Sequence, residues 1–227
     1  MKAAFLVFLL CGSAWADFAA GQQAMKNGDH VAALKEFLPL AKEGDAGAQV
    51  EVGFLYGHGQ GIPHDYKQAE MWYRLAAEQG RTEAQIRLGI IYEQGTDGFA
   101  QDYKEAAKWY RMAADQGNAQ AQIHIGSAYE KGDILGFAQD YKDAAKWYRM
   151  AAEQGNAEAQ YFLGYLYSMG LGVPQDYVEA HMWLNLSGVN GNAASIEARD
   201  IVARKMTPGQ IAEAQRRARE WKPKASQ

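Results

Sequence analysis

The chain has 227 residues, of which 48% are hydrophobic, and its formal net charge is −4. This composition provides enough apolar material for a packed core and excludes a disordered chain. Lys and Arg number 23 against 27 Asp and Glu, without a basic run, so the sequence lacks the positive footprint that binding to nucleic acid or to an anionic membrane requires.

The first sixteen residues are predicted to be a signal peptide. Lys2 provides a short positive start, residues 3–10 are apolar, and Ala14-Trp15-Ala16 offers a cleavage site. This apolar stretch is shorter than the roughly 20 residues of a membrane-spanning helix. We therefore expect cleavage after Ala16, a periplasmic or secreted mature chain, and no membrane span after cleavage. The sequence does not distinguish a periplasmic from an extracellular location.

Cys11 lies inside this predicted signal peptide and is the only cysteine of the chain. A lipoprotein signal expects a small residue before its cysteine, whereas Leu10 stands there, so lipidation is kept as an alternative. After cleavage following Ala16 the mature chain has no cysteine. Neither a disulfide nor a thiol nucleophile can then contribute to its stability or chemistry.

Four copies of one unit follow along the rest of the chain. In each copy an Asp-Tyr pair is followed by a Trp seven residues after the Asp, and successive Trp residues are 37, 38 and 36 residues apart. A repeat of this length is typical of helical solenoids, in which each unit packs on its neighbours. The pairs begin at Asp65, Asp102, Asp140 and Asp176, and the tryptophans are Trp72, Trp109, Trp147 and Trp183.

The first helix of each unit is predicted from an Ala-Gln pair onward. In the first full unit Ala48, Val52 and Leu55 recur at helical spacing on one face, and Gly59 ends the helix. The distance from this Ala to the following Asp is 17, 18, 19 and 17 residues in the four units, while the distance from each Trp to the next Ala stays at 12. We therefore expect all variation in length to fall in the loop between the two helices.

The second helix of each unit has an explicit start. Asp65 is predicted as its N-cap, Gln68 stands three residues later as in a capping box, and Gly80 stops the helix. Because the same pattern recurs before each apolar helix, we interpret the repeated aspartates as caps and not as catalytic or metal-binding carboxylates. The Trp72-Tyr73 pair and its equivalents are predicted to form core contacts within and between units.

Both ends of the array depart from the repeated unit. Residues 17–45 form a shortened first unit with Asp29 at the cap position. The last helix is predicted to start at Thr207, with Gln210 completing a capping box, and to run to about Trp221. The chain is thus divided into a signal peptide (1–16), a shortened N-terminal repeat (17–45), four full repeats (46–81, 82–118, 119–156 and 157–192) and C-terminal capping helices (193–227).

The fourth copy carries a recognisable signature between Ala159 and Gly191, with Leu163-Gly164, Leu166-Tyr167, Gly172-Val173 and Asp176 in order. These residues resemble the unit of the Sel-1-like repeat family, a tetratricopeptide-like family with exported bacterial members. The first and fourth copies also contain the G-x-G-[VI] loop of this family, whereas the middle two have longer loops. The resemblance implies an all-α fold, a right-handed α-solenoid of helix-turn-helix repeats closed by a C-terminal capping segment, which acts as an adaptor or scaffold for protein partners.

A comparison of the four copies predicts where partners bind. Three positions of each first helix, spaced i, i+3 and i+7, vary freely, whereas the Ala-Gln pair before them and the Gly two residues after the first of them are constant. The first helices of tetratricopeptide-like solenoids line the concave surface. We expect the last copy to provide an apolar anchor, and Arg87, His124 and Lys131 to orient an acidic or C-terminal carboxylate group. The predicted groove comprises Glu51, Phe54, His58, Arg87, Ile90, Gln94, His124, Ser127, Lys131, Phe162, Tyr165 and Met169.

Other function classes have less support in the sequence. Some cysteine-rich relatives are reported to bind or hydrolyse β-lactams, but the paired cysteines of those repeats are missing here, as are the S-x-x-K, G-x-S-x-G and H-E-x-x-H motifs. We therefore predict no catalytic residue, no cofactor and no metal site, although His58 and His64 share a loop. A module that binds peptidoglycan or another glycan of the cell envelope stays open as an alternative to a protein scaffold, and a β-lactamase-like hydrolase stays open behind it. The partner, the pathway and the oligomeric state are not predicted.

Overall fold

The computed structural model describes residues 18–59, 62–95, 98–132 and 137–224. The predicted signal peptide, with Cys11, lies outside these residues, as does part of the loop between the two helices of the first three full repeats. The chain forms two compact units, Met1–Asp102 and Tyr103–Gln227. Each unit is described by itself.

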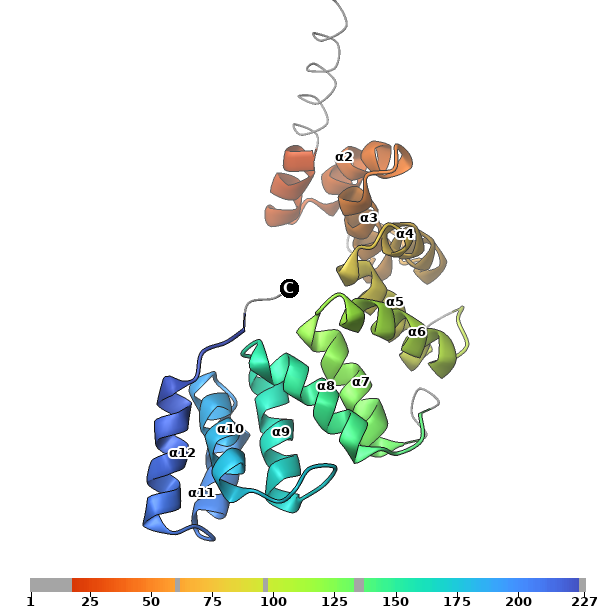
Figure 1. The fold of residues 1–227 in the computed structure, drawn as a ribbon. Helices are drawn as coiled ribbons and strands as arrows, with labels where there is room; N and C mark the ends of the chain where they lie inside the picture. Colours follow the sequence, from red (N-terminus) through yellow and green to blue (C-terminus); the bar gives the residue numbers. More distant parts are fainter. Residues whose placement is uncertain (1–17, 60–61, 96–97, 133–136, 225–227) are drawn as a thin grey trace, which may run out of the picture. The chain divides into compact units, whose positions relative to one another are not determined.

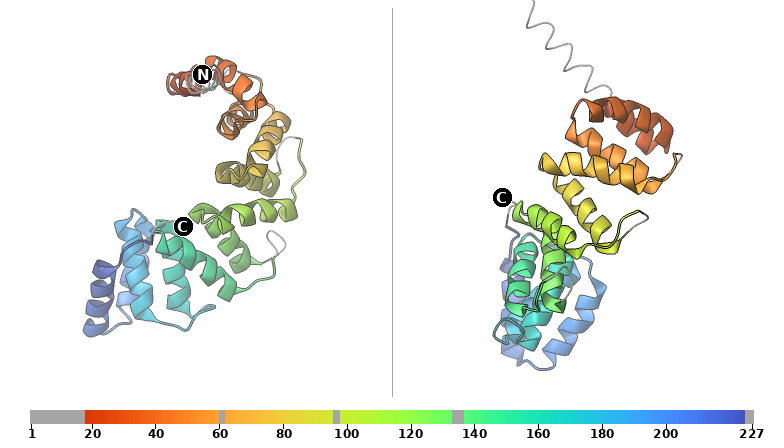
Figure 2. Two further views of the ribbon diagram at one scale, coloured as in Figure 1. Left: turned by 45° about the horizontal axis from the view of Figure 1, so that its top comes forward. Right: turned by 90° about the vertical axis from the view of Figure 1, so that its right-hand side faces the viewer.

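The described chain is an all-α solenoid of antiparallel helix pairs, and no strand occurs in it (Figure 1, Figure 2). In the first unit a helix over residues 18–26 precedes α2 (His30–Lys42), α3 (Ala46–His58), α4 (Tyr66–Glu78) and α5 (Thr82–Gln94). The second unit contains α6 (Tyr103–Asp115), α7 (Ala119–Lys131), α8 (Tyr141–Glu153), α9 (Ala157–Met169), α10 (Tyr177–Val189), α11 (Ala193–Ala203) and α12 (Pro208–Glu220). None of the described helices is long and apolar enough to cross a membrane.

The first helix of each full repeat begins two residues before the Ala-Gln pair. In α3 the cap is Asp45, whose carboxylate accepts a hydrogen bond from the backbone N–H of Ala48 at 2.7 Å. Asn118 and Asn156 cap α7 and α9 in the same way. The apolar pattern could not reveal this extra half-turn, because its residues contribute little to the buried face. The predicted end is confirmed, since Gly59 takes the left-handed conformation at φ 63°.

The second helices α4, α8 and α10 are capped by the repeated aspartates, as predicted. The carboxylate of Asp140 accepts from the backbone N–H groups of Lys142 at 2.9 Å and Asp143 at 3.1 Å, and Asp65 and Asp176 make the same pair of bonds. We therefore expect Asp140→Ala to lower the free energy of unfolding by about 0.5–2 kcal/mol and Asp140→Asn to lower it much less. Urea unfolding measures both; an unchanged midpoint for Asp140→Ala would contradict the capping role.

The reciprocal half of the predicted capping boxes is wrong for these repeats. The backbone N–H of Asp140 donates instead to the carbonyl of Tyr129 at 2.8 Å, and that of Asp65 donates to Tyr56 at 3.0 Å. This hydrogen bond closes the loop between the two helices, so it occupies the N–H that a Gln or Glu side chain would otherwise bind. The complete capping box predicted at Thr207 and Gln210 is confirmed.

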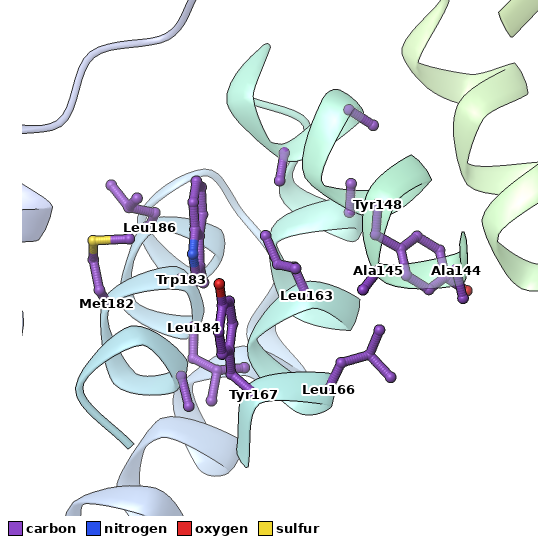
Figure 3. Close-up of a cluster of buried hydrophobic side chains, with 14 of the residues drawn as sticks. Ala144, Ala145, Tyr148, Leu163, Leu166, Tyr167, Met182, Trp183, Leu184 and Leu186 are labelled. Atoms are coloured by element: carbon purple, nitrogen blue, oxygen red, sulfur yellow. The ribbon is translucent and has the colours of Figure 1, made fainter. Parts of the chain in front are cut away.

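Buried aromatic residues hold successive helices of the second unit together. Figure 3 shows side chains from α8, α9 and α10 converging in one cluster that includes Tyr148, Leu163 and Trp183. Tyr148 is fully buried against Gly126 of α7, where a Cβ atom would lie 2.8 Å from the tyrosine ring. The predicted core contact of the repeated Tyr is therefore confirmed at Tyr148, and the close approach of α7 and α8 depends on glycine at position 126.

A buried glutamine in each first helix links it to the preceding helix. The amide of Gln122 donates to the carbonyl of Ala114 at 3.2 Å, while its oxygen accepts a hydrogen bond from Gln154 at 2.9 Å. A buried amide needs such partners, since an unpaired polar group costs free energy. The side chains of Gln49, Gln85 and Gln160 donate to the equivalent carbonyls.

The C-terminal helices cover the last repeat, as predicted for the capped end of a solenoid. In α10 the side chains of Met182 and Leu186 are buried, whereas Met150, at the position of Leu186, is exposed in α8. Helix α12 packs on α10, and Trp221, directly after α12, forms an edge-to-face pair with Trp183 of α10, with ring centroids 6.0 Å apart. The cap thus supplies apolar cover that a following repeat would otherwise give.

Candidate functional site

The twelve residues of the predicted groove lie at or near the surface of the first helices. Six of them stand on α3 and α5 in the first unit, and six on α7 and α9 in the second. None is fully buried. The exposed residues are His58, Gln94, Lys131, Tyr165 and Met169, and the half-buried ones are Glu51, Phe54, Arg87, Ile90, His124, Ser127 and Phe162.

The first position of the variable stripe covers the repeated tyrosine of the preceding helix in the second unit. The imidazole of His124 stacks on Tyr110 with ring centroids 4.4 Å apart and 7° between planes. The ring of Phe162 stacks on Tyr148 at 4.9 Å and 20°. These two side chains therefore contribute to packing, which limits the surface that they can offer to a partner.

Arg87 occupies this position in the first unit, 14 residues after Tyr73, and it has a different environment. Its guanidinium lies 6.0 Å from the centre of the Phe54 ring and 4.0 Å from the Glu83 carboxylate. The Glu83 pair is at the limit of an ion pair, and no described residue forms a hydrogen bond with the Arg87 side chain. The cation of Arg87 is consequently available at the surface.

An open pocket of about 370 Å³ lies beside Arg87, between α3, α4 and α5. Arg87 and the side chains of His58, His64 and Gln94 provide its polar lining. The rest of the lining is small, apolar or aromatic, and comprises Gly57, Tyr66, Ala69, Tyr73, Ile90 and Ile91. Four predicted groove residues, His58, Arg87, Ile90 and Gln94, thus meet in one cavity.

Hydrogen-bond donors face this pocket. The hydroxyl of Tyr73 has no hydrogen-bond partner among the described residues, and burial raises the pKa of this hydroxyl above its ordinary range, so that it remains protonated. His58 places its Nδ1 3.0 Å from the carbonyl oxygen of Phe54. Because a carbonyl can only accept, Nδ1 donates, and Nε2 is left for a ligand.

A second pocket in the first unit has the opposite charge. It measures about 350 Å³ and is lined by Glu51 and Glu83 together with Phe18, Val50 and Arg81 among others. Burial, and then the neighbouring Glu83, raise the pKa of the Glu51 carboxyl. The Glu83 carboxylate, which lines this pocket, lies 4.0 Å from the Arg87 guanidinium, which lines the first pocket. A partner in contact with both pockets therefore requires matching charges.

In the second unit the exposed part of the stripe is apolar on α9. The side chain of Tyr165 is 40% exposed and that of Met169 is 54% exposed, one turn apart along the helix. Phe162 lies one turn earlier, half-buried on Tyr148. Large exposed apolar side chains that cluster in this way are typical of protein contact surfaces.

Sequence comparison did not identify every residue of the first-unit pocket. Tyr73 was assigned to the core, and its hydroxyl was not foreseen as part of the pocket. His64 follows the first helix in a loop whose path the helical pattern does not predict, and Gly57 contributes by having no side chain. Gly57 and Glu130 both stand nine residues after the Ala of the Ala-Gln pair in their repeats. The loss of a large side chain at Gly57 is the feature of the sequence that could have indicated the pocket.

The described part of the chain contains no group of three or more His, Cys, Asp or Glu residues that could hold a metal ion. His58 and His64 meet at the pocket without a third ligand of this kind. The side chains at this site are suited to hydrogen bonding and apolar contact.

Comparisons with known proteins agree with this architecture. The family model of the Sel1 repeat matches residues 46–80, 82–118, 119–156 and 157–190. The structure of a Sel1 repeat protein from Oxalobacter formigenes is similar with a TM-score of 0.76 and 29% identity, over 92% of this chain and 88% of that one. No curated protein matches the chain.

A second solved structure is that of c5321, a protective antigen of uropathogenic Escherichia coli strains with an SLR fold. It is similar with a TM-score of 0.55 and 27% identity. The match covers 88% of this chain but only 55% of the antigen. The two proteins thus share the repeat architecture over part of the longer one.

Proposed function

Because the chain belongs to the Sel1 repeat family, we propose that it is an exported, non-catalytic scaffold that binds a protein partner through the variable faces of its first helices. Sel1 repeat solenoids are generally protein-interaction scaffolds. The observation that carries the proposal is the separation of two kinds of position. The Ala, Gln, Gly and Trp residues that recur in every full repeat are buried, whereas the twelve variable positions are exposed or half-buried.

The variable positions have the chemistry of a protein contact. Helix α9 offers the apolar side chains of Tyr165 and Met169, and the first unit offers Arg87 beside an apolar-walled pocket. Tyrosine and arginine are the residue types most often found to dominate binding energy at interfaces.

A photo-reactive amino acid placed at Tyr165 tests this function. We expect it to cross-link one defined protein in cell-envelope fractions. The same reagent at Met112, which is 37% exposed on the second helix α6, is the matched control and should not cross-link that protein. Equal cross-linking from both positions, or cross-linking to glycan alone, would contradict a protein-binding face on the first helices.

Export is the second part of the proposal, and it rests on the sequence of the first sixteen residues. The similarity to a protein described as a protective antigen supports it. N-terminal sequencing of the protein from periplasmic and secreted fractions should find a chain that begins at Asp17. A chain that retains Lys2 and remains in the cytoplasm would contradict export.

A further inference from the structure

The first-unit pocket exists because two side chains that surround the repeated tyrosine elsewhere are replaced. In the second unit the hydroxyl of Tyr148 donates to Glu130 at 2.6 Å, and its ring is covered by Phe162. Around Tyr73 the position of Glu130 is Gly57, and the position of Phe162 is Arg87. One change removes the hydrogen-bond acceptor and the other removes the ring that stacks on the tyrosine.

The result is a cavity that contains two hydrogen-bond donors for which the described residues supply no hydrogen-bond acceptor. The Tyr73 hydroxyl and the Arg87 guanidinium have no hydrogen-bond partner among the described residues, although Tyr73 is only 3% exposed. Gln94 adds an amide that can donate. A ligand that satisfies these groups must bring acceptor oxygens, and the arginine favours a negative charge.

The apolar part of the pocket lining requires an apolar group. It is formed by Ala69 of α4, one turn from Tyr73, and by Ile90 and Ile91 of α5, one turn from Arg87. An acidic side chain alone would satisfy the donors and leave these surfaces in contact with water. A C-terminal residue carries its carboxylate and its side chain on the same Cα, so a single residue fits both halves of the cavity.

We propose that this pocket binds the C-terminal residue of the partner polypeptide, with its α-carboxylate at Arg87 and Tyr73 and an apolar side chain against Ile90 and Ile91. The inference rests on the scaffold function proposed above and deepens it. In this proposal the first unit binds the C-terminus of the partner, and α9 makes a separate contact with the same partner.

Three short peptides test the chemistry of the ligand. The probes are acetyl-Ala-Ala-Leu with a free carboxylate, the same peptide as its C-terminal amide, and acetyl-Ala-Glu-Ala-amide, each titrated into the full mature chain. The NMR signals of the Ile90 and Ile91 methyl groups are the readout. We expect saturable shifts with the free acid and at least about tenfold weaker binding of the amide, because charge-assisted hydrogen bonds are lost. Equal binding of acid and amide, equal binding of the internal Glu peptide, or no binding of the free acid would overturn the proposal.

Two variants test the position of the ligand. Gly57→Glu restores the acceptor found at Glu130, and the added Cβ would meet only Ala69, at an ordinary 3.5 Å. We expect it to retain or raise the melting temperature and to abolish binding of the free acid. Arg87→Gln should weaken binding about tenfold or more, whereas Lys42→Gln, which removes a cation of α2 outside the pocket, should leave it unchanged. Wild-type affinity in Gly57→Glu, or equal losses in Arg87→Gln and Lys42→Gln, would overturn the assignment.

Failure of this inference is distinguishable from failure of the scaffold function. If the peptides do not bind while the photo-reactive group at Tyr165 still captures its protein, the pocket proposal is wrong and the scaffold function stands. If the free acid binds as predicted while no protein cross-links at Tyr165, the α9 contact is wrong.

Discussion

The Gln122→Glu variant should lose about 3.5 kcal/mol of unfolding free energy at pH 7, because burial raises a carboxyl pKa by about 3 units and each pH unit between the unfolded pKa of about 4.3 and pH 7 costs about 1.36 kcal/mol. The substitution preserves shape and changes one amide nitrogen to oxygen. That nitrogen donates to the carbonyl of Ala114 at 3.2 Å in a fully enclosed position. An ionised carboxylate cannot donate there and repels the carbonyl oxygen.

The sign of the pH dependence follows from the raised pKa. A carboxyl whose pKa is higher in the folded than in the unfolded chain destabilises the fold above its unfolded pKa of about 4.3, and the loss disappears as the pH falls towards that value. The protonated group regains a donor for Ala114. The deficit of Gln122→Glu relative to the parent chain should therefore be largest at pH 7 and shrink by pH 5.

The matched control for this prediction is Gln120→Glu, on the same helix. Gln120 is exposed, and the fourth repeat has Glu158 at the equivalent position. We expect this control to change the unfolding free energy by less than about 0.5 kcal/mol. Urea unfolding of the parent chain and both variants at pH 7 and pH 5 provides the comparison. A deficit of Gln122→Glu below about 1 kcal/mol, or one independent of pH, would show that the glutamine is not a buried structural donor.

Tyr148→Ala should be destabilising by about 3–5 kcal/mol, the usual cost of truncating a buried aromatic residue to alanine. Tyr148 is fully buried, packs on Gly126, and is stacked by Phe162. Its removal leaves a cavity that rigid helices can close only in part. Tyr148→Phe retains the ring and loses the 2.6 Å hydrogen bond to Glu130, so we expect a loss of about 1 kcal/mol.

Tyr165→Ala is the control for this second prediction, since it removes the same side chain from a site that is 40% exposed. We expect a change within about 0.5 kcal/mol. Thermal and urea unfolding followed by far-UV circular dichroism measure the three variants. If Tyr148→Ala and Tyr165→Ala had similar effects, the assignment of the repeated tyrosines to the scaffold would be wrong.

Much of the fold could be predicted because the same helix start and stop signals recur in each repeat. The glycine that ends α3, the aspartate caps of the second helices and the capping box at Thr207 are local features, each set by backbone groups within a few residues. The reciprocal bond of the Asp140 box was predicted wrongly, because a backbone carbonyl from the preceding helix competes for the same N–H. That competitor is close only after the loop has folded.

The glutamine contacts and the pocket depend on tertiary structure and could not be read from one helix. Gln122 marked the repeat register in the sequence, but its role depends on a carbonyl eight residues away in the preceding helix. Variation at Arg87 and His124 was visible, yet the sequence does not show that the imidazole stacks on a tyrosine while the arginine leaves one uncovered. His124 and Arg87 thus occupy the same variable position of their repeats, but one side chain packs on a tyrosine and the other lines a cavity.

The central claim is that variable first-helix positions bind the partner while repeated positions build the scaffold. It is tested most directly by the affinity of the protein that cross-links at Tyr165 for the double variant Arg87→Gln/Tyr165→Ala. We predict loss of binding with an unchanged melting temperature. A double variant with Met71→Ala and Met112→Ala, both exposed on second helices, should bind as the parent chain does. Normal binding by the first variant, or equal loss in the second, would contradict the claim.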